Sequence, residues 1–249
     1  MAGRISIRSA DDLAGIKKQY GNFIGKYKYR AMVCAGAGCI SSGSQSVKEA
    51  LLKSIKEYNL QGKVLVVETG CMGTCDIGPV MIVMPDGVFY TELEPSDIPS
   101  IVKSHFVDDK IKMEKTYYDV RKKKYVPYLD DIDYFKNQVK ITLRNCGAID
   151  YSSLEEYIVR DGYMAAAKVL GQMAPGDVVE EIKKSGLRGR GGGGFPTGIK
   201  WEAGMKAQGS SKYIVCNADE GDPGAFMDRS ILEGDPHSVI EGMIIGGYA

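Results

Sequence analysis

The spacing of hydrophobic and polar residues divides the N-terminal part of the chain into alternating helices and strands. Apolar positions recur every three or four residues in the predicted helices, and short continuous apolar runs mark the predicted strands. The pattern predicts a helix, a strand, a helix, a strand, a hairpin and a helix, over residues 12–25, 27–33, 44–58, 63–68, 80–90 and 96–106. This order is typical of an α/β sandwich of thioredoxin-like type.

The second half of the chain has a weaker pattern, which we interpret as part of another α/β domain. It predicts strands at 139–143 and 212–216, and helices near 152–158, 163–170, 174–185 and 197–201. Between the halves, the cationic run 121–124 and the aspartates after it predict a solvated linker. The expected organisation is a thioredoxin-like domain over 1–107, a linker over 108–135 and a second domain over 136–249.

The composition excludes several classes of protein. Lys and Arg total 32 and Asp and Glu total 32, so no net field attracts nucleic acid or an anionic membrane. No apolar run reaches the roughly 20 residues that span a bilayer, and the N-terminus lacks the apolar core of a signal peptide. We therefore expect a cytoplasmic protein whose six cysteines are metal ligands, catalytic groups or core residues rather than disulfides.

Four of the cysteines occur as two closely spaced pairs. Four residues separate Cys34 from Cys39, three separate Cys71 from Cys75, and each pair follows a predicted strand. Neighbouring strands would bring the four thiolates to one point, and the flanking glycines allow backbone N–H groups to face sulfur. The set suits a [2Fe–2S] cluster or a structural zinc ion. We favour the cluster, because zinc pairs more often have two intervening residues and occur in domains without a core.

The other two cysteines, Cys146 and Cys216, have no partner at ligand spacing. We expect both to be buried as small hydrophobic residues.

A glycine-rich segment over residues 187–201 is the other candidate site. Its backbone N–H groups and cations suit a phosphate, and the candidate ligand-binding residues are Gly189, Arg190, Gly191, Gly192, Gly193, Gly194, Phe195 and Lys200. The spacing fits the Rossmann fingerprint literally, but a predicted helix precedes it where that fingerprint needs a strand. A flexible linker is the alternative, although linkers rarely contain Arg, Phe and Trp.

A polar cluster follows the predicted strand 212–216. Its members are Asn217, Asp219, Glu220 and Asp222. Carboxylates repel phosphate, so they would meet hydroxyl or ring N–H donors of a ligand, as in a flavin or a nicotinamide nucleotide. A solvated turn is the alternative interpretation.

These motifs resemble known families. The cysteine spacing over residues 5–107 resembles the thioredoxin-like [2Fe–2S] ferredoxin family, which recurs in complex I and in multisubunit hydrogenases. Segments 187–201 and 215–237 resemble the flavin subunit of complex I, and still more the β subunit of NAD(P)-linked [FeFe] hydrogenases. The fusion of both parts is also similar to that hydrogenase subunit.

The resemblance implies an electron-transfer oxidoreductase that binds FMN and NAD(P)(H) in one cavity and relays electrons through iron–sulfur clusters. The glycine loop, Lys200, Asn217, Asp219 and Glu220 would hold FMN. Phe195 would stack on the adenine of NAD(H), with a hydrophobic plug as the equal alternative. Asp222 would approach the nicotinamide end, so Asp222 and Glu220 are the candidate catalytic residues.

The sequence also departs from the family. Many relatives have Glu where Asp222 stands, and some have an aromatic residue at the position of Ala203. The family continues with the rest of the flavin fold and a Cys-x-x-Cys-x-x-Cys motif for a [4Fe–4S] cluster, which these 249 residues do not contain. Expected partners are a hydrogenase catalytic iron–sulfur subunit and a small ferredoxin-like subunit. The alternative function is a non-catalytic [2Fe–2S] carrier or docking module with an incomplete flavin domain.

Overall fold

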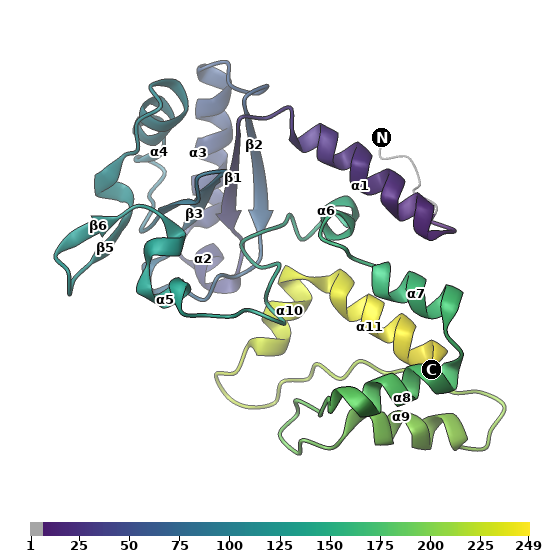
Figure 1. Ribbon diagram of the computed structural model, residues 1–249. Helices are drawn as coiled ribbons and strands as arrows, with labels where there is room; N and C mark the ends of the chain where they lie inside the picture. Colours follow the sequence, from purple (N-terminus) through teal and green to yellow (C-terminus); the bar gives the residue numbers. More distant parts are fainter. Residues whose placement is uncertain (1–6) are drawn as a thin grey trace. The chain divides into compact units, whose positions relative to one another are not determined.

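The computed structural model describes residues 7–249, which fold as two compact units (Figure 1). The first unit comprises Gln19–Tyr157 and Glu220–Pro236, and the second comprises residues 7–18, Ile158–Asp219 and His237–Ala249. Helix α1, Ala10–Ile24, runs across the boundary between them and agrees with the predicted helix 12–25.

The first unit is built on a four-stranded sheet in the order β2-β1-β3-β4. The strands are β1 (Tyr29–Cys34), β2 (Val64–Thr69), β3 (Met81–Met84) and β4 (Val88–Tyr90). Helix α3, Ser44–Glu57, connects β1 to the parallel strand β2, whereas β3 and β4 form an antiparallel hairpin beside β1. This topology confirms the prediction of a thioredoxin-like fold.

Successive side chains of strand β1 point to opposite faces of the sheet and pack into two different cores, as the period of a β-strand requires. Ala31 and Val33 pack with α3, with α4 (Ile98–Ile101) and with the π-helical segment Val102–Val107 that continues α4. Met32 and Cys34 face the opposite core, which includes Phe89. Both faces of the sheet are therefore buried.

The second core is covered by part of the segment predicted to be a linker, so the prediction of a solvated linker is wrong for residues 116–135. Strands β5 (Tyr117–Asp119) and β6 (Lys124–Val126) form a hairpin, and isolated bridges join Thr116 and Tyr128 to the free edge of β4. Val126, Ile132 and Phe135 pack into the core. The cationic run 121–124 lies at the exposed end of this hairpin, which explains why its sequence resembles a linker.

Short helices complete this unit. They are α2 (Ala37–Ser41), the 3-10 turns Cys75–Ile77, Met113–Lys115 and Leu129–Asp131, and helices α5 (Asp133–Lys136), α6 (Leu154–Val159) and α10 (Met227–Gly234). The strand predicted at 139–143 does not form, and Val139 and Ile141 are 90% and 73% exposed. An apolar run of this length predicts a strand only where another strand can pair with it.

The second unit contains α7 (Met164–Gln172), α8 (Pro175–Ser185), α9 (Thr197–Lys206) and α11 (Pro236–Tyr248). The Glu241 carboxylate of α11 accepts hydrogen bonds from the backbone N–H groups of Tyr163 and Ala166, at the start of α7. A Cβ at Gly198 of α9 would lie 2.6 Å from Lys183 Cγ, so glycine permits the close packing of α8 and α9.

The strand predicted at 212–216 is not formed either. Residues 207–220 have no regular secondary structure, and Tyr213 and Val215 are 86% and 79% exposed. No strand in the described part of the chain pairs with this segment, although its apolar, β-branched sequence favours one.

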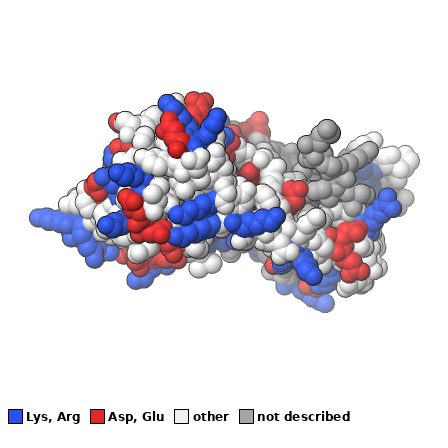
Figure 2. All heavy atoms as spheres, turned by 90° about the horizontal axis from the view of Figure 1, so that it is seen from above, with Lys and Arg blue, Asp and Glu red and all other residues white. Residues whose placement is uncertain are grey.

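Basic and acidic side chains are interspersed on the face of the molecule shown in Figure 2, in agreement with the balance of charges in the sequence. Among residues 7–249, none of the helices has both the length and the apolar character needed to cross a lipid bilayer.

Candidate functional site

The sheet brings the two cysteine pairs together. Cys34 is the last residue of β1, and it pairs in register with Thr69, the last residue of the parallel strand β2. The cysteine loops that follow the two strands therefore begin side by side, at the same end of the sheet. Cys39 lies on α2, whereas Cys71 follows β2 and Cys75 opens the adjoining 3-10 turn.

The four thiols form a row of neighbours. Cys34 is hydrogen-bonded to both Cys39 and Cys71, and the Sγ atoms of Cys71 and Cys75 are 3.6 Å apart. Within residues 7–249, no group of three or more His, Cys, Asp or Glu side chains is arranged to hold a metal ion. Cys34 nevertheless links the first cysteine pair to the second, so the four thiols form one continuous set. A binuclear cluster takes two thiolates on each iron, so this donor set fits a [2Fe–2S] cluster.

Three glycines allow the cysteine loops to pack closely against one another. A Cβ at Gly36 would lie 2.6 Å from Cys71 Cβ, and one at Gly38 would lie 2.9 Å from Cys75 Cβ. A Cβ at Gly78 would lie 2.9 Å from Cys39 Sγ. Real Cβ atoms do not approach other atoms so closely, and glycine is therefore required at these positions for the loops to meet.

Backbone N–H groups also face the sulfur atoms, as expected from the flanking glycines. The N–H of Gly73 donates to Cys71 Sγ at 3.4 Å, and Gly36 and Val80 donate to Cys34 and Cys39. Such hydrogen bonds stabilise negative charge on a thiolate or on a cluster.

The thiols differ in exposure and in acidity. Cys34 and Cys39 are buried, whereas Cys75 reaches the surface. The hydrogen bond with Cys39 raises the pKa of Cys34 to about 11 and lowers the pKa of Cys39. Burial raises the pKa of Cys75 to about 11. Four adjacent thiolates would repel one another, and bound iron ions would supply the compensating charge.

A segment that the sequence analysis did not connect with this site packs beside it. The Cys146 side chain is buried, as predicted, and a Cβ at Gly70, next to Cys71, would lie 3.0 Å from Cys146 Sγ. The N–H of Gly147 donates to Thr69 Oγ1 at 2.9 Å. No other cysteine lies close to Cys146 in the sequence, as it would in a pair of metal ligands. The sequence pattern therefore does not predict this contact. The same prediction is wrong for Cys216, which is exposed because the strand around it does not form.

Lys140 belongs to the same segment and was also not predicted. Its Nζ lies 5.1 Å from the ring centroid of Phe135. Burial lowers the pKa of Lys140, while the thiols of Cys146 and Cys71 act in the opposite direction. The lysine is therefore close enough to the cysteine cluster for their charges to interact.

The glycine loop lies in the second unit as an exposed turn between α8 and α9. It is closed by Gly189 N–H, which donates to the Phe195 carbonyl at 2.9 Å, and by the Arg188 guanidinium, which donates to the Gly194 carbonyl. Gly192 and Gly194 have φ of 96° and 59°, which favours glycine. Phe195 is 57% exposed and Lys200 is also exposed, so both can reach a ligand.

Two glycines of this loop are not explained by folding. Gly191 and Gly193 have no positive φ, and a Cβ at either position would meet no atom within 4 Å in the described residues. A position that could hold alanine yet holds glycine is expected where an external group must approach the backbone closely. This observation fits a phosphate-binding loop.

The polar cluster is divided between the two units. Asn217 and Asp219 belong to the second unit, and Asp219 N–H donates to Asn217 Oδ1 at 3.1 Å. Glu220 and Asp222 belong to the first unit. The carboxylate of Glu220 accepts the backbone N–H groups of Asp228 and Arg229 at the start of α10. Burial raises the pKa of Glu220, but these backbone hydrogen bonds outweigh it and lower the pKa overall.

Comparisons with known proteins find family matches for two parts of the chain. Residues 13–105 match the family described as thioredoxin-like [2Fe–2S] ferredoxin, and residues 182–249 match the family described as Nuo51 FMN-binding domain. The first match contains all four paired cysteines, and the second contains the glycine loop and the polar cluster.

Several curated proteins are similar to parts of the chain. The NADP-reducing hydrogenase subunit HndC of Solidesulfovibrio fructosivorans is 60% identical over 46% of this chain and 23% of its own length. An NADH-quinone oxidoreductase subunit of Rhizobium meliloti is 51% identical over 44% of this chain and 26% of its own length. The NAD-reducing hydrogenase HoxS subunit alpha of Cupriavidus necator is 33% identical over 89% of this chain and 35% of its own length.

This chain therefore spans about a quarter to a third of the length of these relatives. The matches confirm the resemblance inferred from the motifs. The chain therefore combines a part that matches thioredoxin-like [2Fe–2S] ferredoxins with a part that matches the Nuo51 FMN-binding domain, and it is similar to subunits of NADH-quinone oxidoreductases and NAD(P)-linked hydrogenases.

Proposed function

We propose that this chain is an electron-transfer component of an NAD(P)(H)-linked oxidoreductase, in particular of the multisubunit [FeFe] hydrogenase type. Electrons would pass between NAD(P)(H), FMN and iron–sulfur clusters. The similarity to a hydrogenase subunit and to subunits of NADH-quinone oxidoreductase supports this reaction class. The activity is a proposal because the chain covers only part of each relative.

The observation that carries the proposal is the convergence of four thiols at the ends of two parallel strands. Cys34, Cys39, Cys71 and Cys75 would hold the [2Fe–2S] cluster, and the backbone N–H groups around them would stabilise its negative charge. Cys75 is the exposed member of the set. Electrons would therefore reach the cluster most directly from the side of Cys75.

The flavin-binding part would contribute the glycine loop. Gly189, Arg190 and the glycines to Gly194 would surround a phosphate, and Lys200 would add positive charge. Bound FMN would supply the step that links two-electron chemistry of the nicotinamide to one-electron transfer. Phe195 would stack on the adenine of NAD(P)(H).

The polar cluster would bind the hydroxyl and ring N–H groups of these nucleotides. We propose that Asn217 and Asp219 bind FMN, and that Glu220 and Asp222 are the catalytic residues. The hydrogen bonds of Glu220 to the start of α10 support a role in fixing the backbone of this segment. Asp222 would then be the residue that approaches the nicotinamide.

Because the relatives are subunits of larger enzymes, we propose that the chain works in a hetero-oligomer. A hydrogenase catalytic iron–sulfur subunit and a small ferredoxin-like subunit are the expected partners. A reducing compartment such as the cytoplasm would keep the thiolate ligands available. A [4Fe–4S] cluster, as the family resemblance implies, would have ligands outside these 249 residues.

A second function is favoured by one observation. The four cysteines, the sheet that positions them and both hydrophobic cores all lie in the first compact unit. This unit could hold a cluster without bound flavin, so the chain could also serve as a [2Fe–2S] carrier or docking module.

Anaerobic purification followed by metal analysis, absorbance and EPR spectroscopy separates these functions. The electron-transfer enzyme component predicts iron together with stoichiometric FMN, and absorbance that NADH or NADPH bleaches. Iron without flavin would support the carrier. Zinc in place of iron would contradict both.

A further inference from the structure

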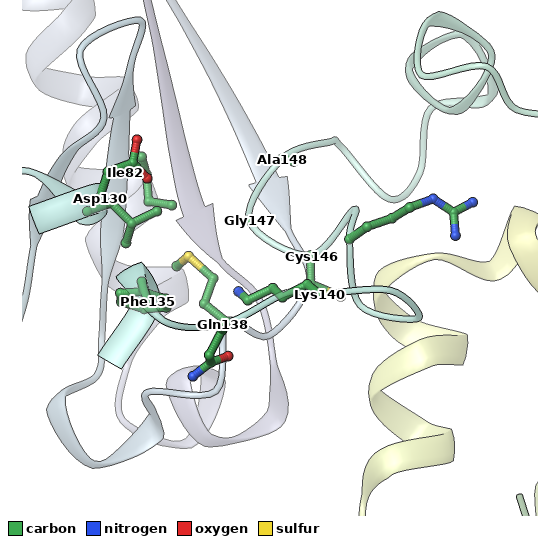
Figure 3. Close-up of a pocket in the computed structure, with 11 residues that line it drawn as sticks. Ile82, Asp130, Phe135, Gln138, Lys140, Cys146, Gly147 and Ala148 are labelled. Atoms are coloured by element: carbon green, nitrogen blue, oxygen red, sulfur yellow. The ribbon is translucent and has the colours of Figure 1, made fainter. Parts of the chain in front are cut away.

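A cavity of about 290 Å³ lies directly beside the cysteine cluster (Figure 3). Its lining includes Met72, Phe135, Gln138, Lys140, Cys146 and Gly147. Met72 immediately follows the candidate ligand Cys71, and the lining residues Cys146 and Gly147 contact Gly70 and Thr69, just before that ligand.

The cationic end of Lys140 enters this cavity. Figure 3 shows its side chain extended toward Phe135, with Cys146 beside its stem. The Nζ atom lies over the Phe135 ring, and no carboxylate in residues 7–249 comes within ion-pair distance of it. A half-buried ammonium without an acidic partner is unusual, because burial of a charge requires compensation.

A [2Fe–2S] cluster on the four cysteines would supply the compensating charge. A [2Fe–2S] cluster held by four thiolates is negatively charged, and its negative charge increases by one when it accepts an electron. Negative charge on Cys71 acts to raise the pKa of Lys140, so negative charge held at this cysteine would attract the ammonium. Asp130 also lines the cavity, but it forms no ion pair with Lys140 among the residues described.

We propose that Lys140 is a positioning residue that raises the reduction potential of the cluster by placing a positive charge in the cavity beside Cys71. Reduction adds negative charge next to this ammonium, and their attraction stabilises the reduced state more than the oxidised state. The inference rests on the proposed function, because it requires a cluster on the four cysteines.

The experiment is an EPR-monitored redox titration of the full chain, purified without oxygen. Lys140→Gln removes the charge, Lys140→Arg keeps it, and Lys53→Gln removes an equal charge from an exposed site on α3. At a fixed potential, Lys140→Gln should lower the ratio of reduced to oxidised cluster about threefold to tenfold, where tenfold equals about 59 mV. The other two variants should match the unsubstituted protein.

A second substitution keeps the test independent of any damage at position 140. Gln138→Glu places a negative charge in the same cavity and should lower the potential in the same direction. The inference is overturned if the cluster is present and Lys140→Gln does not shift the potential beyond Lys53→Gln; if Lys140→Gln does not assemble a cluster, the absence of a shift in Gln138→Glu overturns it. If the unsubstituted protein holds no cluster, the proposed function fails instead.

Discussion

Gly36 lies directly against Cys71, so that a Cβ at position 36 would be 2.6 Å from Cys71 Cβ and 3.2 Å from its Sγ. The two residues come from the loops after β1 and β2, and this contact brings the two halves of the ligand set together. Because the neighbour is the first side-chain carbon of a short residue, it cannot rotate away from an added methyl group.

We therefore predict that Gly36→Ala separates the two loops and prevents normal cluster assembly. Iron content and the EPR signal should fall to less than half, while the fold is retained by the two cores on either side of the sheet. Gly62→Ala is the matched control, because a Cβ at Gly62 would meet no atom within 4 Å. Normal cluster content in Gly36→Ala would show that the loops do not have to meet this closely.

The glycine loop allows folding to be separated from ligand binding. Gly193→Ala should leave the free energy of unfolding unchanged or raise it by about 0.5 kcal/mol, because alanine restricts the unfolded chain. It should weaken FMN binding at least about tenfold, if the phosphate needs to approach the backbone at this position. Titration of flavin fluorescence measures the affinity.

Gly198→Ala is the opposite case and serves as the control. Its Cβ would lie 2.7 Å from Lys183 N, so the substitution should lower the free energy of unfolding by about 1–3 kcal/mol. Equal FMN affinity in Gly193→Ala and in the unsubstituted protein would remove the main support for a phosphate at this loop.

Glu156 is the centre of a buried polar network in the first unit. It is 2% exposed and accepts hydrogen bonds from Arg30, from the Tyr20 hydroxyl and from Asp150 N–H. Glu156→Ala would leave the Arg30 guanidinium largely buried without a partner. We expect the free energy of unfolding, measured by urea denaturation, to fall by about 3–5 kcal/mol.

The exposed ion pair of Lys53 and Glu57 provides the comparison. Its atoms are 4.0 Å apart and its side chains are 78% and 55% exposed, so Glu57→Ala should cost about 0.5 kcal/mol or less. A similarly small effect of Glu156→Ala would mean that the Arg30–Glu156 pair is not a structural link.

His105 should make stability depend on pH. It is 3% exposed, and its Nδ1 lies 2.9 Å from the Tyr90 hydroxyl. Burial lowers its pKa from 6.5, although Asp86 and Asp109 act in the opposite direction. The folded protein therefore keeps the imidazole neutral while the unfolded chain takes up a proton below about pH 6.5. This contribution to stability is complete above that pH and is lost as the pH falls toward the lower, folded-state pKa.

Urea denaturation between pH 7.5 and 5 tests this assignment. His105→Gln removes the titrating group, so its stability should fall less steeply than that of the unsubstituted protein over this range. The difference in slope should not exceed about 1.4 kcal/mol per pH unit for one proton. Parallel curves would show that His105 does not couple protonation to folding.

The fold of the first unit was largely predictable because each of its predicted strands pairs with another predicted strand of the same unit. The apolar runs ending at Cys34 and Thr69 pair with each other in the structure, and the hairpin at Pro85 supplies the next two strands. Periodicity and turn chemistry therefore specify the same topology. The spacing of the cysteines then follows from the positions where these strands end.

The errors arise where the environment, rather than the local pattern, decides the outcome. The run from Tyr213 to Cys216 has the composition of a strand but has no partner in the described residues. The segment predicted to be a solvated linker has an exposed cationic run, yet its apolar residues Val126, Ile132 and Phe135 cover a core that the sheet leaves open. The position of Lys140 beside Cys71 depends on how a loop packs, and no sequence spacing encodes that.

The cysteine cluster is the central claim, and substitution of each cysteine by alanine tests it most directly. Alanine removes the ligand atom without offering an oxygen in its place. We predict about two iron atoms per chain and a reduced-state EPR signal in the unsubstituted protein. This signal should be lost in the Ala variants of Cys34, Cys39, Cys71 and Cys75, and retained in Cys216→Ala, whose thiol is exposed elsewhere in the chain. An unaltered signal in any of the first four variants, or its loss in Cys216→Ala, would contradict the account.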